Sequence, residues 1–485
     1  MGPARRGGQH PRRSGDPRGA DDPRRRAVFL VSRGAFRGGR ARDEPPDPAE
    51  GSETLTLRAR RRSPQARGRP LALPGIFPTR GRGRGDALEC RRLTCRPMGK
   101  RARSRRNAQR RPHMKTTTRV LIIGGGVVGC SVAYHLTKLG WSDVMLLERS
   151  ELTSGSTWHA AGGFHTLNGD TNMAALQGYT IRLYRELEEI TGMSCGLHHV
   201  GGVTLADTPE RLDMLRAERA KHRFMGLETE IIGPEEIARI APVTNVEGIL
   251  GGLYDPLDGH LDPSGTTHAY AKAARMGGAE IVLHTKVLET NPRPDGTWDV
   301  VTDKGTIHAE HVVNAAGLWA REVGHMAGIE LPLHPMEHQY IVTDDIPEIY
   351  ERGAEHPHVM DPAGESYLRQ EGRGLCIGFY EQTCRPWAVD GTPWEFGHEL
   401  LPDDFDKIED SIAFAYKRFP VLERAGVKSV IHGPFTFAPD GNPLVGPVPG
   451  LRNYWSACGV MAGFSQGGGV GLSLAQWMVE GEPER

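Results

Sequence analysis

The stretch Arg119–Ser150, "RVLIIGGGVVGCSVAYHLTKLGWSDVMLLERS", determines the fold class that we expect for this chain. Its first apolar run, Val120–Ile123, is short and continuous, which is typical of a parallel strand buried on both faces. A glycine-rich turn follows, and apolar residues at helical spacing then continue as far as Gly140. A second apolar run, Val144–Leu147, predicts a neighbouring parallel strand. The stretch therefore predicts a strand, a helix and a second strand of an α/β fold.

The glycine-rich turn has the spacing of a dinucleotide site. Gly124, Gly126 and Gly129 form GxGxxG, in which the glycines permit the turn, the approach of the backbone to a pyrophosphate and close packing of helix and strand. The helix N-terminus adds partial positive charge. Glu148 ends the second strand, about twenty residues beyond the last glycine, where an acid accepts hydrogen bonds from ribose hydroxyls. These four residues and the flanking strands predict a Rossmann-type dinucleotide-binding domain.

The sequence after this unit favours FAD over NAD. A nicotinamide dehydrogenase usually continues with further alternating strands and helices. Here a glycine- and serine-rich loop, Thr153–Gly163, follows instead, and the chain returns to the nucleotide domain with His311–Ala320 and the glycine-rich helix start in Gly463–Pro483. Such a helix directs its positive end toward the negative charge that a reduced flavin develops. An NAD-dependent dehydrogenase remains the alternative.

Composition restricts the classes of function. The chain has 60 Lys plus Arg and 60 Asp plus Glu, but the basic residues concentrate in residues 1–113 and the acids in the remainder. Acids interrupt the basic segment and aromatic residues are nearly absent from it, so we expect no nucleic-acid partner. Apolar runs are too short to span a bilayer, so we expect no membrane association. The 7 cysteines form no CxxC pair, which argues against a metal site and suits a reducing compartment.

Residues 1–113 are expected to be a disordered, Arg-rich extension. Arg, Gly, Pro and Ser alternate there without a helical or strand period. Because Met114 lies directly before the first expected strand, we interpret this segment as an upstream extension that is not a genuine part of the protein. Its acidic residues also weaken it as a mitochondrial transit peptide. We therefore expect a cytoplasmic enzyme, with the mitochondrial matrix as the alternative.

Several ordered stretches between Thr116 and Pro483 resemble one family of flavoproteins. They are "IIGGGVVGCSVAYHL", "SGSTWHAAGG", "GGLYDPLDGHLDP", "DGTWDVVTDKG", "VNAAGLWAREVG", "PMEHQYIVT", "IHGPFTFAPDGNPLVGP" and "GGGVGLSLAQWMVEGEP". The chain resembles the FAD-containing part of the dimethylglycine dehydrogenase and sarcosine dehydrogenase family, within the D-amino-acid-oxidase-like superfamily. Unrelated FAD enzymes share the first and last stretches, so the middle ones make the resemblance specific.

The resemblance implies an α/β (α+β) fold, with a Rossmann-type FAD-binding domain and a discontinuous β-sheet substrate domain. The expected FAD-binding segments are about 116–164, 263–329 and 430–485, and the expected substrate-domain segments are about 165–262 and 330–429. Within them, Pro263–Met276 is typical of a helix with Asp262 as its N-cap. The turn Glu371–Gly374 indicates a hairpin.

The same resemblance assigns residues to the site. It implies that His159, in "STWHAAG", carries the flavin covalently through a bond from a ring nitrogen to the 8α-methyl carbon. Neutral imidazole is a suitable nucleophile near neutral pH, but a histidine that only packs over the flavin beside Trp158 is the alternative. His338 in "EHQY" and Tyr367 in "ESYLR" are the expected catalytic residues, which handle the amine proton and orient the substrate. The further expected cofactor-binding residues are Ser156, Trp158, Gly317, Asp440 and Gly467.

Other polar residues are weaker candidates. Tyr254, Asp258 and His260 lie in "LYDPLDGHLD" and suit either a cleft wall or an ordinary turn. The substrate carboxylate needs a cation or a cluster of donors, and Arg369 and Arg385 are both available for that role. The adjacent pair His198-His199 has no metal-ligand spacing that we recognise.

We therefore predict the oxidative demethylation of an N-methyl amino acid of the dimethylglycine or sarcosine class. Hydride passes to flavin N5 and the iminium product hydrolyses, with an electron-transfer flavoprotein or oxygen as the acceptor. Family members usually continue into a tetrahydrofolate-binding domain, which we expect to be absent from this chain because it stops at Arg485. A truncated, non-catalytic flavin-binding protein is a further alternative.

Overall fold

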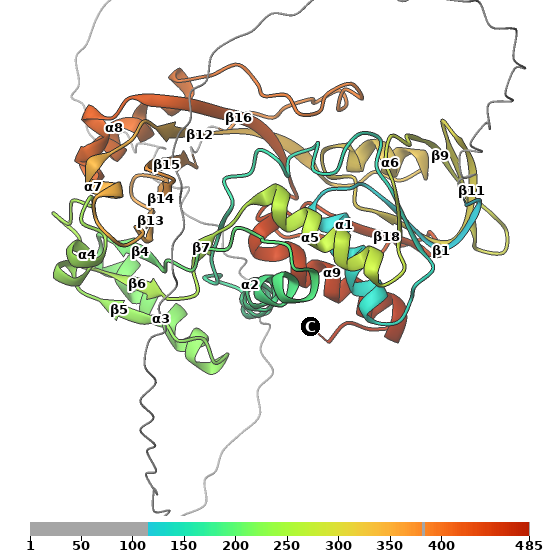
Figure 1. Ribbon diagram of the computed structural model, residues 1–485, viewed down its shortest axis with the longest axis horizontal. Helices are drawn as coiled ribbons and strands as arrows, with labels where there is room; N and C mark the ends of the chain where they lie inside the picture. The colour runs from blue at the N-terminus through green and yellow to red at the C-terminus, as the bar shows by residue number, and fades with distance from the viewer. Residues whose placement is uncertain (1–114, 381–383, 485) are drawn as a thin grey trace, which may run out of the picture. The chain divides into compact units, whose positions relative to one another are not determined.

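Two large β-sheets organise the part of the chain that the computed structural model describes, residues 115–380 and 384–484 (Figure 1). These residues belong to one compact unit. The predictions for residues 1–113 lie outside the described residues. No described helix combines the length and the apolar character that crossing a bilayer requires.

The first sheet contains the predicted strand–helix–strand unit. Its central strand β1 (Thr117–Ile123) pairs in parallel with β2 (Val144–Leu147) on one side and with β11 (Gly305–Asn314) on the other. The order of the sheet is β17-β18-β11-β1-β2-β8, and β9 and β10 extend it beside β11. The remaining strands are β8 (Glu280–Val282), β9 (Val287–Pro292), β10 (Trp298–Thr302), β17 (Leu444–Pro447) and β18 (Tyr454–Cys458). Both predicted strands of the dinucleotide unit are confirmed.

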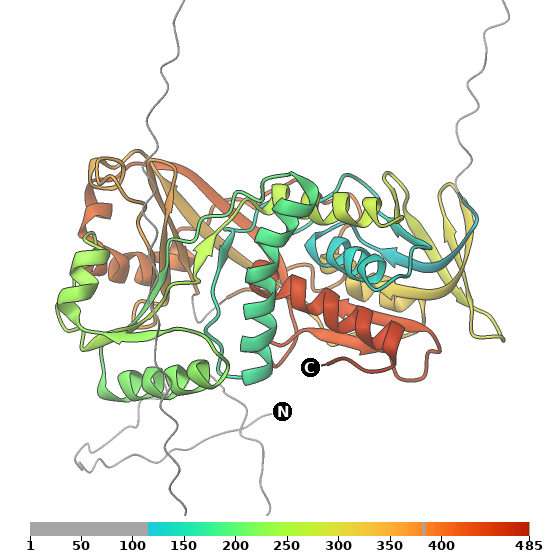
Figure 2. The same ribbon diagram turned by 60° about the horizontal axis from the view of Figure 1, so that its bottom comes forward.

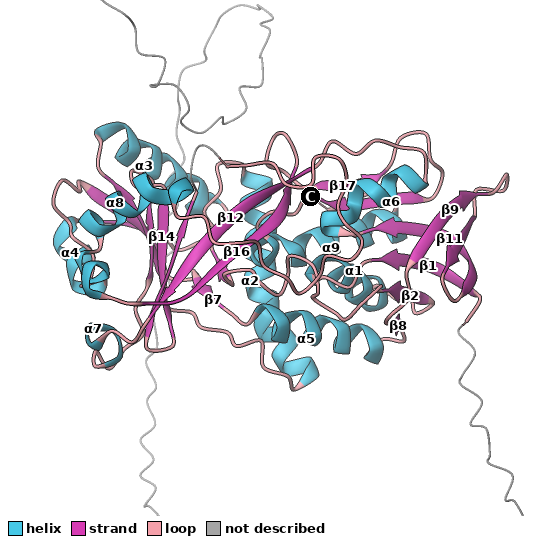
Figure 3. Ribbon diagram, turned by 90° about the horizontal axis from the view of Figure 1, so that it is seen from above, coloured by secondary structure: helices cyan, strands magenta, loops and turns pink. Residues whose placement is uncertain are grey.

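Alternate residues of β1 enter two separate cores, as the pleat of a strand requires. Val120 and Ile122 are buried with residues of α1, α5, α9 and α2, whereas Leu121 and Ile123 are buried with α6, β9 and β10. Because both faces are covered, the strand is apolar throughout. Figure 3 shows α1, α5 and α9 beside these strands. The helices are α1 (Val127–Lys138), α2 (Thr171–Thr191), α5 (Pro263–Met276), α6 (Ala320–Met326) and α9 (Gly463–Glu480).

The second sheet has the order β16-β12-β15-β14-β13-β4-β6-β5. Its longest strands, β12 (His334–Thr343) and β16 (Val427–Phe437), pair antiparallel and extend from this sheet toward the first (Figure 1). The predicted hairpin is confirmed, because Glu371 pairs with Gly374 at its turn. The other strands are β4 (Gly202–Ala206), β5 (Glu230–Ile232), β6 (Gly251–Asp255), β13 (His358–Asp361), β14 (Ser366–Glu371) and β15 (Gly374–Phe379).

Two elements cross the segment boundaries that the sequence predicted. α2 lies in the predicted substrate segment, but it packs beside α9 (Figure 2), and the Tyr184 hydroxyl donates to the carbonyl of Phe464 at 2.5 Å. β16 runs past residue 430, where the last FAD segment was expected to begin, because it pairs with β12 along its length. The division into domains otherwise stays a prediction.

One helix of the first sheet matches its predicted bounds, and the remaining elements are short or lie around the second sheet. α5 begins and ends where the sequence predicted, and the Asp262 carboxylate accepts from the Ser264 amide as its N-cap. The rest are α3 (Pro209–Phe224), α4 (Pro234–Ile240), α7 (Pro347–Tyr350), α8 (Glu409–Arg418) and the two-stranded ladder of β3 (Gly163–Phe164) with β7 (Gly259–His260).

Candidate active site

One cavity of about 320 Å³ receives residues from both sheets, and we refer to it as the main cavity. It begins at the glycine turn after β1, passes the loop that carries His159 and the start of α9, and ends under the second sheet at His338 and Tyr367. Its volume lies within the usual range for sites that bind small molecules and cofactors. The main cavity therefore joins the predicted nucleotide site to the predicted catalytic residues.

The glycine turn at one end of the main cavity leaves no room for side chains. Gly124 has φ +116°, and a Cβ there would lie 2.4 Å from the carbonyl oxygen of Ala315. A Cβ on Gly129 would lie 2.0 Å from the carbonyl oxygen of Gly124, so this glycine serves helix–strand packing and does not line the cavity. Gly126 lines the cavity as the N-cap of α1. The backbone can therefore approach a phosphate closely, as the sequence predicted.

Glu148 closes the same end of the main cavity. One carboxylate oxygen accepts from the Gly125 amide at 2.8 Å, and the other accepts from the Ser150 amide at 2.8 Å. These bonds fix the carboxylate and leave it lone pairs for the hydroxyls of a ribose. Burial raises the pKa of Glu148, against the lowering effect of these two amides. The position matches the role predicted for it.

Sequence reasoning missed the wall beyond Glu148. Thr285, Lys286 and Val287 line the main cavity there, together with Trp394 from the long loop after β15. The Lys286 ammonium lies 4.4 Å from the centre of the Trp394 ring. Arg149 holds this loop by donating to the Trp394 carbonyl at 2.5 Å. The loop has no regular period, so only the tertiary structure shows its place.

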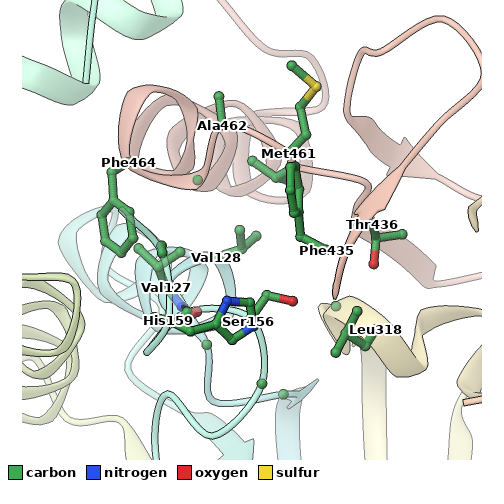
Figure 4. A pocket seen from close by; sticks show the side chains of 18 of the residues that line it. Val127, Val128, Ser156, His159, Leu318, Phe435, Thr436, Met461, Ala462 and Phe464 are labelled. Carbon is green, nitrogen blue, oxygen red and sulfur yellow. Dashed lines mark hydrogen bonds between the residues drawn. The ribbon is translucent and has the colours of Figure 1, made fainter. Parts of the chain in front are cut away.

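His159 lies in the loop between β2 and β3 and lines the main cavity. Its side chain is buried, and Nε2 has no hydrogen-bond partner among the described residues. Burial lowers the pKa of His159 to about 4, so the ring is neutral at pH 7. Ser156 lies beside it and donates to the Pro434 carbonyl at 2.7 Å. Figure 4 shows both side chains facing the start of α9.

The start of α9 lies opposite His159 and was located one turn too late from the sequence. Met461, Ala462, Gly463 and Phe464 line the main cavity, whereas the predicted Gly467 packs against Val127 and does not. The N-terminus of a helix carries partial positive charge. α9 therefore directs positive potential into the cavity, as predicted, but with its first turn.

Two further residues predicted to bind the cofactor lie outside the lining of the main cavity, and their roles stay predictions. Trp158 is not among the described residues that line the main cavity. Its ring packs edge-on against His159, with centroids 5.6 Å apart, and against His398. Asp440 is exposed in the turn between β16 and β17, where it accepts from the Asn442 amide at 3.0 Å. Gly317, in contrast, lines the cavity with φ +54°. Small-residue motifs thus marked the correct loops without identifying every contact.

His338 and Tyr367 both line the main cavity from the second sheet. Tyr340 pairs with Gly378, and that register places His338 opposite Tyr380. The Tyr380 ring lies 5.7 Å from the rings of both His338 and Tyr367. The Tyr367 ring lies over Gly378, where a Cβ would be 2.2 Å from its Cζ. The fold therefore brings the two predicted catalytic residues to one wall.

Ionisation distinguishes the residues on this wall. Burial raises the pKa of Tyr367 well above 10, so its phenol stays protonated and is a hydrogen-bond donor at neutral pH. Burial likewise raises the pKa of Tyr340 and Tyr380. The His338 ring lies between aromatic neighbours, with its centroid 4.8 Å from that of Phe435. These residues can orient an amine and hold a substrate inside the main cavity.

The weaker candidates separate into two groups. Asp258 and Arg369 line the main cavity, whereas Tyr254 and Arg385 do not, and Arg385 is paired with Asp404 at 2.6 Å. The Arg369 guanidinium is buried, and it donates to the Ala161 carbonyl at 2.7 Å and to Glu371 at 2.6 Å. Arg369 therefore ties β14 to the loop of His159.

His198 and His260 lie in a different place. They line a second, adjoining cavity together with Glu355, which we refer to as the side cavity. Their nitrogen and oxygen atoms lie within 4.8 Å of one another, close enough to hold a metal ion, although the sequence predicted none. Sequence reasoning also missed His358, which lines the main cavity next to them. Its sequence context, "HPHVMD", carries no catalytic motif.

These features fit FAD. The glycine cradle excludes side chains where a pyrophosphate would lie, and the fixed Glu148 carboxylate suits a ribose. His159 lines the same cavity farther along, and its Nε2 is buried with no hydrogen-bond partner among the described residues. A buried polar atom without a partner is costly unless a ligand satisfies it.

Comparison with known proteins gives a consistent result. Residues 119–477 match the family described as FAD dependent oxidoreductase. The chain is 45% identical over 377 residues to mitochondrial dimethylglycine dehydrogenase of Rattus norvegicus, which covers 77% of this chain and 44% of the relative. It is 38% identical over 379 residues to mitochondrial sarcosine dehydrogenase of Homo sapiens, covering 77% and 41%. The chain thus spans less than half the length of these relatives.

A solved structure supports the same fold. The L-proline dehydrogenase of P. horikoshii superposes with a TM-score of 0.68 and 26% sequence identity, over 76% of this chain and 96% of that one. That protein therefore shares the overall arrangement of strands and helices described above.

Proposed function

Because this chain belongs to the family of FAD dependent oxidoreductases, we propose that it oxidatively demethylates an N-methyl amino acid of the dimethylglycine or sarcosine class. FAD is its cofactor, so the NAD-dependent alternative falls away. The proposal is supported by the identity to dimethylglycine and sarcosine dehydrogenases and by the enclosed wall of His338 and Tyr367. The single observation that carries it is that His159 lines this cavity with a buried Nε2 that has no hydrogen-bond partner among the described residues.

The chain's own residues would hold FAD from the glycine turn to the loop of His159. The backbone at Gly124 and Gly126 would hold the pyrophosphate, and Glu148 would accept from the ribose. His159 would carry the flavin through a bond from Nε2 to the 8α-methyl carbon. A neutral nitrogen with a free lone pair is the nucleophile that such a bond requires. When bound, FAD supplies the oxidant that accepts a hydride from the N-methyl carbon.

The second sheet would position the substrate. Tyr367, as a protonated phenol, donates a hydrogen bond to the substrate, and His338 takes part in removing the amine proton. The lone pair of the amine must be free before the methyl group can be oxidised, so a proton acceptor is needed in this cavity. Arg369 is a buried cation that lines the same cavity, and its positive charge favours a substrate carboxylate.

The relatives support a choice of electron acceptor and of cellular compartment. Because dehydrogenases of this kind are the relatives at 45% and 38% identity, we favour an electron-transfer flavoprotein over oxygen. The printed names of both relatives place them in mitochondria, which favours the mitochondrial matrix over the cytoplasm that the sequence predicted. The proposal does not include a tetrahydrofolate-binding domain.

The test is to denature the full chain in acid and follow flavin fluorescence with the polypeptide, and then to add dimethylglycine or sarcosine anaerobically to the native protein. We expect flavin to stay with the parent and to be lost from His159→Ala, and the amine to bleach the flavin of the parent. His325→Ala, which changes an exposed side chain of α6, is the matched control and should retain its flavin. Flavin that stays oxidised with every N-methyl amino acid would favour the non-catalytic alternative.

A further inference from the structure

Three histidines and one glutamate form a continuous row from the main cavity to the protein surface. His358 lines the main cavity, and its Nε2 lies 3.2 Å from Nδ1 of His260. His260 Nε2 lies 3.1 Å from Oε1 of Glu355, and the other oxygen of Glu355 lies 2.8 Å from Nδ1 of His198. The side chains of His198 and Glu355 are 50% and 30% exposed. Each link in the row is thus a hydrogen bond or an ion-pair contact.

The rings are held in a fixed order. His198 and His260 stack with centroids 4.9 Å apart and planes 7° apart, and His260 and His358 stack with centroids 5.4 Å apart and planes 9° apart. His260 and His358 are buried. The backbones of His198 and His260 are also joined, because they exchange two hydrogen bonds, at 2.8 and 3.0 Å. Such stacking keeps the nitrogen atoms aligned.

The carboxylate sets the tautomers of the two inner rings. An ionised carboxylate has only acceptor sites, so Nε2 of His260 must carry the hydrogen that it donates to Glu355. In a neutral ring Nδ1 of His260 is then an acceptor, and Nε2 of His358 must be the donor to it. Nδ1 of His358 is left with a bare lone pair. The row therefore points its one open acceptor toward the interior.

The surroundings of the rings keep them neutral. Burial, together with smaller effects of the Arg369 cation and of His198, lowers the pKa of His260 to about 3. Burial also lowers the pKa of His358 well below 6.5, with His260 and Arg369 acting in the same direction. A neutral imidazole has one donor and one acceptor nitrogen, so it can pass a proton on without remaining charged.

The open edge of His358 borders the main cavity. A Cβ on Gly163 would lie 3.4 Å from Cε1 and 3.8 Å from Nδ1 of His358, and Gly163 lines the same cavity. Because residue 163 is a glycine, no side chain from it covers this edge of the ring. A proton released in the main cavity can therefore reach Nδ1.

From this geometry we infer that His358, His260 and Glu355 conduct a proton out of the main cavity to solvent at His198. The inference rests on the proposed function, in which the amine of the substrate must lose a proton. Once His338 has taken part in removing the proton from the amine, Nδ1 of His358 accepts it and the Nε2 hydrogen of His358 passes to His260. The Nε2 hydrogen of His260 then passes to Glu355 and on to water. One proton enters and one leaves, and rotation of the rings restores the first tautomers. Glu355 therefore has two roles, because it fixes the tautomers of the two histidines and also takes the proton from His260.

Glu355→Gln tests the path, because an amide donates as well as accepts and no longer fixes the tautomers. We expect anaerobic flavin reduction by the amine to slow about a hundredfold, as for loss of a proton-transfer group, with flavin content unchanged. D2O should slow flavin reduction more in Glu355→Gln than in the parent. Glu351→Gln, four positions earlier and exposed, is the matched control and should reduce at the parental rate. His260→Ala should also reduce its flavin slowly, and added imidazole should restore the rate of reduction.

Nitrogen NMR of the histidine side chains gives a readout that needs no turnover. The parent should show the hydrogen on Nε2 of both His260 and His358, and Glu355→Gln should disturb both signals. Parental reduction by Glu355→Gln, or a hydrogen on Nδ1 of His358 in the parent, would overturn the path. So would activity that is lost on chelation and restored by zinc, which would identify His198, His260 and Glu355 as metal ligands. If the amine reduces no flavin even in the parent, the proposed function fails, and the tautomers still decide the path.

Discussion

Gly433 of β16 lies directly against the imidazole of His159. A Cβ at position 433 would lie 2.7 Å from Cε1, 2.8 Å from Nδ1 and 2.9 Å from Nε2 of that ring. Real side chains do not approach so closely, so the ring keeps its place only because residue 433 is a glycine. A strand of the second sheet thus decides where the proposed attachment atom lies in the main cavity.

Gly433→Ala should therefore displace His159 and impair covalent attachment. A shift of about 1 Å at a reacting atom can slow a reaction about a hundredfold. The fraction of flavin that stays with acid-denatured protein should fall strongly, while non-covalent binding persists. Gly233→Ala is the matched control, because nothing lies within 4 Å of its Cβ position. Parental attachment in Gly433→Ala would mean that the ring moves without consequence and would remove the role that we give to this contact.

Glu148→Ala should weaken FAD binding, and the effect is best measured where the flavin can dissociate. In a His159→Ala background, the dissociation constant of FAD should rise about 10- to 100-fold, as for loss of hydrogen bonds to a charged group. Fluorescence titration of the apoprotein measures it. Glu148→Gln, which keeps an acceptor oxygen for one of the two backbone amides, should lose less. Equal affinity in all these proteins would show that the carboxylate does not contact the cofactor.

His338→Ala and Tyr367→Phe should slow flavin reduction by the amine far more than they lower flavin content. For the loss of a group that handles a proton, a decrease of about a hundredfold or more is typical. Tyr367→Phe keeps the ring over Gly378, so its loss of rate isolates the hydroxyl. Anaerobic stopped-flow reduction and the visible spectrum give the two quantities. A parallel loss of both would assign these residues to packing.

Stability should fall on acidification because several histidines are buried as neutral rings. His135 is fully buried, Nδ1 lies 2.8 Å from the Ser131 carbonyl, and burial lowers its pKa to about 3, against 6.5 when unperturbed. Between these values the unfolded chain binds the proton and the folded chain does not. The free energy of unfolding therefore decreases as pH falls from about 6.5 toward 3, by up to about 1.4 kcal/mol per pH unit for this residue.

Urea unfolding at a series of pH values measures this slope, and His135→Gln should make it shallower. Above pH 7 neither state of the ring is protonated, so the slopes of parent and variant should coincide there, which serves as the internal control. An identical slope for both proteins between pH 4 and 6 would contradict the burial of a neutral His135.

The sequence by itself determined the elements whose signals are local. β2 and α5 begin and end where the apolar runs and the Asp262 cap predicted, because periodicity and capping act within a few residues. The roles of Gly124 and Gly129 were also predictable, since a Cβ there meets backbone atoms of the same strand–helix unit or of the adjacent strand end. The family resemblance then led to His159, His338 and Tyr367, all of which line the main cavity.

Only the tertiary structure decided which side chains reach the cavity and which stand behind it. Trp158 and His159 are adjacent in sequence, yet one ring lines the cavity and the other backs it. His260 and His358 are 98 residues apart and form one hydrogen bond, because β7 and β13 bring them together. Local patterns fix backbone conformation, whereas the direction of a loop side chain and the meeting of distant strands depend on packing and register across the whole fold.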